Sequence, residues 1–255
     1  TGTVNNDGGF SIKSDVYYPE QRDFIQKCMQ TIWNVIYDAA YGDHSDLEAH
    51  PYHTMDDDGN EVDAPEITSA YEAISRVIDI DSLVDMYILH EICQDGDMAY
   101  SSKYFALDMS EKGSHKLVYT APWDFDSGLG TNSGETAKTN EIFVMNTANP
   151  WFVVFAYQDW FWTRVYDRFM EAKEAGVFSH AVSQIDEWAV LYEEAYARNY
   201  AKWQTLGNPV EMSQVQEARS FRSQADAAAY LSKWVDRRIK DLEGLLRAKA
   251  EAAGA

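Results

Sequence analysis

The chain has 255 residues, and its 42 Asp and Glu against 21 Lys and Arg give a formal net charge of −21. A surface this acidic excludes non-specific nucleic-acid binding, which needs a basic face, and disfavours docking on anionic lipid. With 255 residues, 45% of them hydrophobic and 14% aromatic, the chain can build one substantial domain or two small ones, and no apolar stretch approaches the length of a membrane span. The two cysteines, Cys28 and Cys93, lie in apolar helical patterns and are expected to be buried free thiols.

At least four segments have the period of a helix, beginning with residues 19–42, which open with Pro19 and stop at Gly42. A second helix is expected within residues 79–94, with Asp81 as its N-cap. The aromatic segment 149–176 is expected to be a buried helix, and further helices are expected at about 179–204 and 224–247. We therefore expect one domain over residues 1–247, followed by a frayed tail at 248–255.

Residues 101–109 ("SSKYFALDM") and 116–126 ("KLVYTAPWDFD") alternate and are rich in Tyr, Phe and Val, which predicts a β-hairpin. At the end of its second strand, Asp124 and Asp126 would point to the same face, with Cα atoms roughly 6.6 Å apart. Carboxylates this close repel each other unless a proton, a base or a cation lies between them. The alternative is an acidic strand end with both groups in water.

Another acidic segment, residues 50–66, contains Asp56, Asp58 and Asn60 and loosely resembles a calcium loop. Its glycine is misplaced and no glutamate closes it, so we expect a solvated turn.

No phosphate-binding glycine loop, nucleophile elbow or HExxH motif is present, which leaves carboxylates as the candidate chemistry. Asp95 and Asp97 precede the hairpin and Asp124 and Asp126 follow it, so the two pairs are expected to meet at its base. Phosphoryl transfer uses such an arrangement, with one aspartate at the attacking hydroxyl and another on Mg²⁺.

The segment "IDIDSLVDMYILHEICQDGDMAYSSKYF", followed by "KLVYTAPWDFDSGLG", resembles the CotH family of spore-coat-protein-H-like atypical kinases. The resemblance covers most of residues 8–247. It implies a mainly α fold with a small antiparallel β-hairpin (α+β), namely the helical C-terminal lobe of an atypical protein-kinase-like fold. The lobe that grips the nucleotide is expected before residue 8, and Lys13 is too isolated to be assigned as its lysine.

The resemblance implies Asp97 as the catalytic aspartate and Asp124 and Asp126 as metal ligands, without deciding which of the two binds more directly. Ser102 stands where the family carries a second-metal asparagine or serine, and Asp95 is expected to be a neighbouring surface charge. His90 is expected to be a packed or capping histidine. The implied cofactors are Mg or Mn and ATP, while the nucleotide-binding residues stay unassigned.

The function that the resemblance implies is metal-dependent phosphate transfer from ATP to Ser or Thr of a secreted or surface protein. We expect this lobe to be inactive alone. Bacterial members of the family are often exported or surface-linked, so the resemblance implies a bacterial protein with an extracellular, cell-surface or spore-associated place. The alternative function is that of a non-catalytic surface or scaffold module, stabilised by a cation or bound to a partner at its acidic site.

Overall fold

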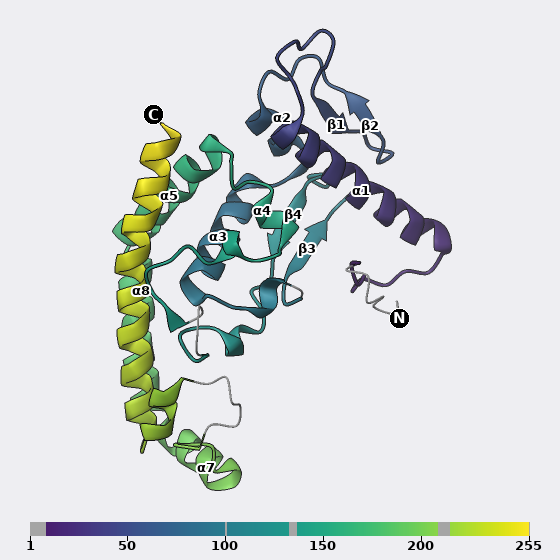
Figure 1. Cartoon of the computed structure of the whole chain (residues 1–255). Helices are drawn as coiled ribbons and strands as arrows, with labels where there is room; N and C mark the ends of the chain where they lie inside the picture. The colour runs from purple at the N-terminus through teal and green to yellow at the C-terminus, as the bar shows by residue number, and fades with distance from the viewer. Residues whose placement is uncertain (1–8, 100, 133–136, 209–214, 255) are drawn as a thin grey trace. The chain divides into compact units, whose positions relative to one another are not determined.

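The computed structural model describes residues 9–99, 101–132, 137–208 and 215–254 (Figure 1). The described chain is mainly helical with two small antiparallel sheets of two strands each, which confirms the mainly α class with a small β component. It divides into two compact units. The first unit is formed by Thr1–Leu83 and Tyr104–Thr120, and the second by Val84–Lys103 and Ala121–Ala255.

The first unit is built around helix α1 (Pro19–Tyr41), which begins at the predicted proline and is followed by Gly42. The helix turns its apolar stripe, from Cys28 to Ala39, towards the core, where it packs against helix α2 (Ala70–Val77) and strand β1 (His53–Met55). Cys28 is a buried free thiol as expected, and so is Cys93 in the second unit.

The acidic segment between α1 and α2 is a hairpin, in which β1 pairs with β2 (Glu61–Asp63). Asp56 lies at its turn, where Oδ1 accepts hydrogen bonds from the backbone N–H groups of Asp58 at 3.0 Å and Asn60 at 2.7 Å. This is the side-chain-to-backbone bonding that favours aspartate in turns. The expected turn is therefore present, with two short strands and α2 that the sequence analysis did not predict.

The second sheet is the predicted hairpin of β3 (Tyr104–Leu107) and β4 (Leu117–Thr120), in a register that pairs Tyr104 with Thr120 and Leu107 with Leu117. Strand β4 ends at Thr120, because Ala121 and Asp124 adopt positive φ angles of 46° and 66° that no β-strand contains. Asp124 precedes the 3-10 helix η2 (Phe125–Ser127), in which Asp126 lies. The expectation that both aspartates share one face of a strand is therefore wrong.

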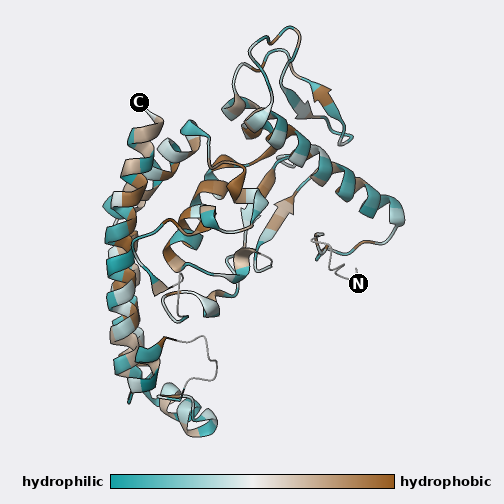
Figure 2. Ribbon diagram, in the orientation of Figure 1, coloured by the Kyte–Doolittle hydropathy of each residue, from teal (hydrophilic) through white to brown (hydrophobic). Residues whose placement is uncertain are grey.

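Helix α3 (Ile80–Cys93) begins in the first unit and continues into the second. Its first turn is capped by Asp79, whose Oδ1 accepts a hydrogen bond from the Ser82 N–H at 2.8 Å, and not by Asp81 as expected. The predicted stripe is buried, namely Leu83, Val84, Tyr87, Ile88 and Ile92. Figure 2 shows apolar residues on α3, in agreement with its place in the core.

The helices of the second unit that follow the site are α4 (Pro150–Val153), α5 (Asp159–Glu174), α6 (Val177–Leu191), α7 (Glu193–Trp203) and α8 (Gln224–Ala253). Helices α5 and α6 both pack along α8. The expected single helix over 149–176 is divided between α4 and α5. Both pieces contribute rings to one core, since Tyr87 of α3 contacts Phe152 of α4 and Phe161 of α5 edge to face.

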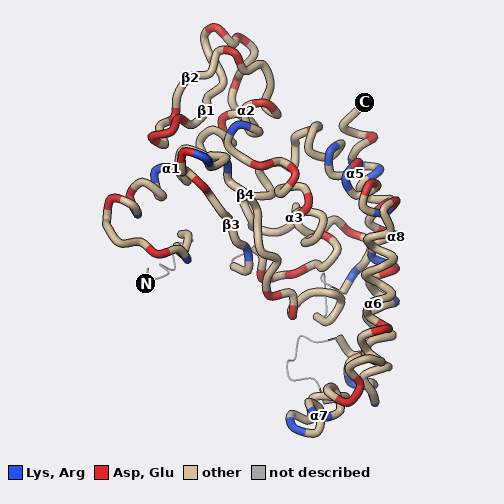
Figure 3. Tube along the Cα trace, turned by 180° about the vertical axis from the view of Figure 1, so that it is seen from behind, with Lys and Arg blue, Asp and Glu red and all other residues tan. Residues whose placement is uncertain are grey.

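Helix α8 continues to Ala253, through residues that we expected to fray. Leu246 is fully buried and Lys249 Nζ lies 4.9 Å from the centre of the Trp162 ring, so the last turns are attached to the core of the unit. Among the described residues, every helix is either too short or too polar to span a bilayer. Figure 3 shows acidic residues in both units.

Candidate metal centre

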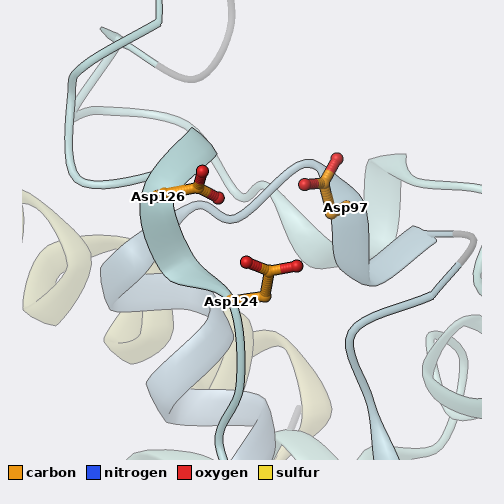
Figure 4. A group of neighbouring side chains, drawn as sticks. All are labelled: Asp97, Asp124 and Asp126. Atoms are coloured by element: carbon orange, nitrogen blue, oxygen red, sulfur yellow. The ribbon is translucent and has the colours of Figure 1, made fainter.

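Three carboxylates of the second unit converge on one point, although they come from segments that are far apart in sequence. Asp97, Asp124 and Asp126 each offer an oxygen, and these oxygens all lie within 4.8 Å of one another. Figure 4 shows the three side chains, with Asp97 on one ribbon and Asp124 and Asp126 on another. We call these residues the acidic cluster. The expected proximity of Asp97 to the PWDFD aspartates is confirmed.

The segment that carries Asp97, residues 94–99, is called the Asp97 loop. It begins where Gln94, with a positive φ of 50°, ends helix α3, and Asp97 opens the 3-10 helix η1 (Asp97–Ala99). The carbonyl of Met98 accepts two hydrogen bonds, from Lys103 Nζ at 3.0 Å and Asn149 Nδ2 at 2.9 Å. Asn149 is fully buried and also caps α4. Sequence reasoning missed its role, although Asn-Pro at a helix start is the signal of an N-cap.

The segment that carries the other two aspartates, residues 121–130, is called the Asp124 loop. Asp124 takes the left-handed conformation, with φ 66° and ψ 52°, which Asp tolerates better than most residues. The turn is closed behind Asp126 by Thr131, whose hydroxyl donates to the Gly128 carbonyl at 2.6 Å. Asn132 Nδ2 donates to the Ser127 carbonyl at 2.8 Å. The backbone of this loop is thus fixed by the side chains of the two residues that follow it.

Asp95 is not the surface charge that the sequence analysis expected, because its side chain is completely buried. Its Oδ1 accepts hydrogen bonds from the Ser127 hydroxyl at 2.9 Å and the Asp97 N–H at 3.1 Å. Its Oδ2 is buried and has no hydrogen-bond partner among the described residues. Burial raises the pKa of the Asp95 carboxyl, the bonds from Ser127 and Asp97 oppose this, and the nearby charges of Asp97 and Asp124 raise it further.

The charge of the acidic cluster is not balanced by the protein within the described ranges. None of its carboxylates forms an ion pair with a Lys or Arg there, and all three residues are exposed. Carboxylate oxygens are the ligands that Mg²⁺, Mn²⁺ and Ca²⁺ prefer, and a cation relieves the repulsion among them. The residues present therefore fit a hard divalent cation.

Ser102, the candidate second-metal residue, lies beside the cluster. Its hydroxyl is 3.4 Å from Asp124 Oδ2, and its backbone has a positive φ of 51°. Asparagine occupies this backbone region more readily than serine does. The structure therefore brings together Asp97, Asp124, Asp126 and Ser102, the four residues that the sequence analysis assigned to the catalytic or metal site.

A buried ion pair at the end of α3 was not predicted. The Glu91 carboxylate accepts hydrogen bonds from the backbone N–H groups of Phe143 and Val144, each at 2.9 Å, and from the Tyr87 hydroxyl at 2.8 Å. It also pairs with Arg238 of α8 at 2.8 Å. Burial raises the pKa of Glu91, and the positive charge of Arg238 opposes this change most strongly. The sequence did carry a signal that Arg238 is buried, because this residue lies four positions from both Trp234 and Leu242 on the apolar stripe of α8.

His90 is a packed residue, as expected. It is 1% exposed, and its ring lies 5.3 Å from that of Phe125 and 6.0 Å from that of Phe152. Neither ring nitrogen has a hydrogen-bond partner among the described residues. Burial lowers the pKa of His90 to about 4, with a smaller contribution from the charge of Lys103, so the imidazole is neutral at physiological pH.

The fold and the cluster together define a mainly helical protein with an all-carboxylate site on two adjoining loops. A family model described as CotH kinase protein matches residues 4–242, nearly the whole chain. The chain belongs to the CotH kinase family and is an atypical kinase-like domain. A comparison with curated proteins finds no match, and neither does a comparison with solved structures.

Proposed function

We propose that the protein transfers phosphate from ATP to Ser or Thr hydroxyls of a protein substrate, using Mg²⁺ or Mn²⁺ bound at the acidic cluster. The observation that carries the proposal is the convergence of oxygens from Asp97, Asp124 and Asp126 within 4.8 Å, with no Lys or Arg paired to them in the described segments. Membership of the CotH kinase family supports phosphoryl transfer as the chemistry.

The two loops are assigned different tasks. Asp124 and Asp126, on the Asp124 loop, would hold the cation, which when bound neutralises negative charge on the nucleotide phosphates. Asp97, on the opposite loop, would accept the proton of the attacking hydroxyl and orient it, while its charge, within 4.8 Å of the other two carboxylates, would add to their attraction for the cation. Ser102 would add a hydroxyl oxygen on the side of Asp124, since the two side chains are 3.4 Å apart. Catalysis by such a site rests on positioning and charge, so the geometry of the two loops is its main requirement.

Family membership supports a proposal for the substrate and the location. We propose a secreted or surface protein as the acceptor, and an extracellular, cell-surface or spore-associated place for the enzyme. The runner-up function is a non-catalytic module whose acidic cluster binds a structural cation or a partner.

The test is transfer of labelled phosphate from ATP, with Mg²⁺ or Mn²⁺, to proteins rich in Ser and Thr, by the protein at the length made in its host. We expect cation-dependent phosphoserine or phosphothreonine and a loss of at least about a hundredfold in Asp97→Asn, the size of a general-base contribution. Asp167→Asn, which removes one exposed carboxylate from α5, is the matched control and should keep wild-type activity. Equal activity in Asp97→Asn and the control would reject the assignment. Cation binding without any transfer would favour the non-catalytic module.

A further inference from the structure

The Asp97 loop and the Asp124 loop are joined directly, by contacts that do not involve the acidic cluster itself. The Leu129 N–H donates to the Cys93 carbonyl at 2.6 Å, which links the end of α3 to the Asp124 loop. The Ser127 hydroxyl donates to Asp95 Oδ1 at 2.9 Å, across 32 positions of sequence. The separation of the carboxylates therefore depends on these links, because Asp97 stands on one loop and Asp124 and Asp126 stand on the other.

The Asp95 side chain bonds to both loops at once. The oxygen that accepts from Ser127 also accepts from the backbone N–H of Asp97, at 3.1 Å. It therefore fixes the residue after Asp126 and the backbone of Asp97 relative to a single atom. Because the Asp95 side chain is completely buried, water does not compete freely for these bonds.

Gly128 shows how closely the loops approach. A β-carbon at this position would lie 2.5 Å from the Cys93 carbonyl oxygen and 3.3 Å from the Asp95 Cα. Its φ of −100° is open to any residue, so the contact and not the backbone conformation requires glycine. An alanine here would meet backbone atoms, which cannot rotate away, and would push the loops apart.

We propose that Asp95 is a positioning residue, which sets the distance between Asp97 and the Asp124–Asp126 pair and thereby the affinity of the cluster for its cation. This inference rests on the proposed cation-binding role of the cluster. Partners that orient metal ligands typically contribute tenfold to a hundredfold to metal affinity. Asp95 would act through its hydrogen bonds and not as a ligand, so the oxygen that accepts them matters more than the charge.

That distinction gives the test, a Mn²⁺ titration of variants of the full chain. Asp95→Ala removes both hydrogen bonds, and Gly128→Ala separates the loops while keeping every polar group. Each should weaken Mn²⁺ binding about tenfold or more. Asp95→Asn keeps an oxygen for Ser127 and Asp97 and should stay within about threefold of wild type. Ser223→Ala is the control for general destabilisation, because it removes the hydroxyl that caps α8 and should leave Mn²⁺ affinity unchanged.

Wild-type Mn²⁺ affinity in Asp95→Ala would overturn the inference. An equal loss of Mn²⁺ affinity in Asp95→Asn and Asp95→Ala would also overturn it, because the Asp95 charge would then act on the cation directly. A metal-independent measurement separates this inference from the proposed function. Amide hydrogen exchange at Asp97 and Leu129 should be faster in Asp95→Ala than in wild type and unchanged in Ser223→Ala. If the wild-type chain bound no Mn²⁺, the cation proposal would fail, and unchanged exchange in Asp95→Ala would overturn the link between the loops as well.

Discussion

Arg238 and Glu91, 147 residues apart in sequence, form an ion pair in which neither side chain has any exposed surface. The Arg238 guanidinium donates to the Glu91 carboxylate at 2.8 Å, and its Nη1 donates to the carbonyls of Thr139 at 2.7 Å and Glu141 at 2.8 Å. This network joins α8 and the 139–144 segment to the end of α3. Since α3 leads directly into the Asp97 loop, the pair helps to fix the helix end from which this loop starts.

Removing one member of this pair should be costly. Arg238→Met leaves the Glu91 carboxylate buried without its counter-charge, and we expect the free energy of unfolding to fall by about 3–5 kcal/mol. Glu91→Gln in the same chain removes the stranded charge and should recover part of the loss. Urea unfolding of the three proteins measures both values. If the free energy of unfolding of Arg238→Met lay within about 1 kcal/mol of the wild-type value, the pair would contribute little to stability.

His90 makes stability depend on pH. The unfolded imidazole titrates near 6.5 and the folded one near 4, so between these values the unfolded state binds more protons. Stability is therefore fully present above pH 6.5 and is lost as pH falls towards 4. The free energy involved is at most about 3 kcal/mol.

His90→Leu removes this titration, so the wild type should lose stability relative to the variant as pH falls from 6.5 to 4. The difference in free energy of unfolding between the two proteins cancels most of the pH dependence that comes from Glu91 and Asp95, whose pKa values are raised. Urea unfolding at several pH values measures the difference, with His180→Gln on the exposed side of α6 as the control. Parallel pH profiles for wild type and His90→Leu would contradict the prediction.

The sequence predicted the elements whose periodicity is long and regular. The stripes of α1, α3 and α8 and the alternation of β3 and β4 record which side faces the core, because burial selects residues at the period of the element. The shorter α2 and the three-residue strands β1 and β2 offer too few positions for a period to show. The polar turn at Asp56 was predicted, but not the strands on either side of it.

The cluster was predicted because one acidic segment precedes a hairpin and another follows it, and the two ends of an antiparallel hairpin lie close together. Its local geometry was not predictable in the same way. The strand reading of PWDFD failed since the positive φ values of Ala121 and Asp124 leave no pattern of polarity. Nothing in the sequence distinguishes Asp95 from a surface charge, because an aspartate in a polar turn is usually solvated. Its burial depends on contacts with Ser127, which lies on a distant segment.

Ser102 provides a gain-of-affinity test. Its hydroxyl lies near Asp124, and an asparagine amide oxygen is a better ligand for a hard cation than a hydroxyl that already donates to a carboxylate. Because the backbone there has a φ of 51°, asparagine fits without added strain. Ser102→Asn should bind Mn²⁺ more tightly by a few-fold, and Ser102→Ala should bind no more tightly than wild type. An unchanged affinity in Ser102→Asn would place Ser102 outside the cation site.

The central claim is that the acidic cluster binds a divalent cation, and isothermal titration with Mg²⁺ and Mn²⁺ tests it most directly. The wild-type chain should bind one ion, and the double variant Asp124→Asn/Asp126→Asn should not bind, because an amide keeps the shape of the side chain but removes its charge. Asp167→Asn with Asp186→Asn removes two charges elsewhere in the second unit and controls for the overall change in net charge. Binding in the wild type and this control, and its loss in the Asp124→Asn/Asp126→Asn variant, is the predicted result. Equal cation affinity in all three proteins would contradict the claim and return the PWDFD aspartates to the role of solvated surface charges.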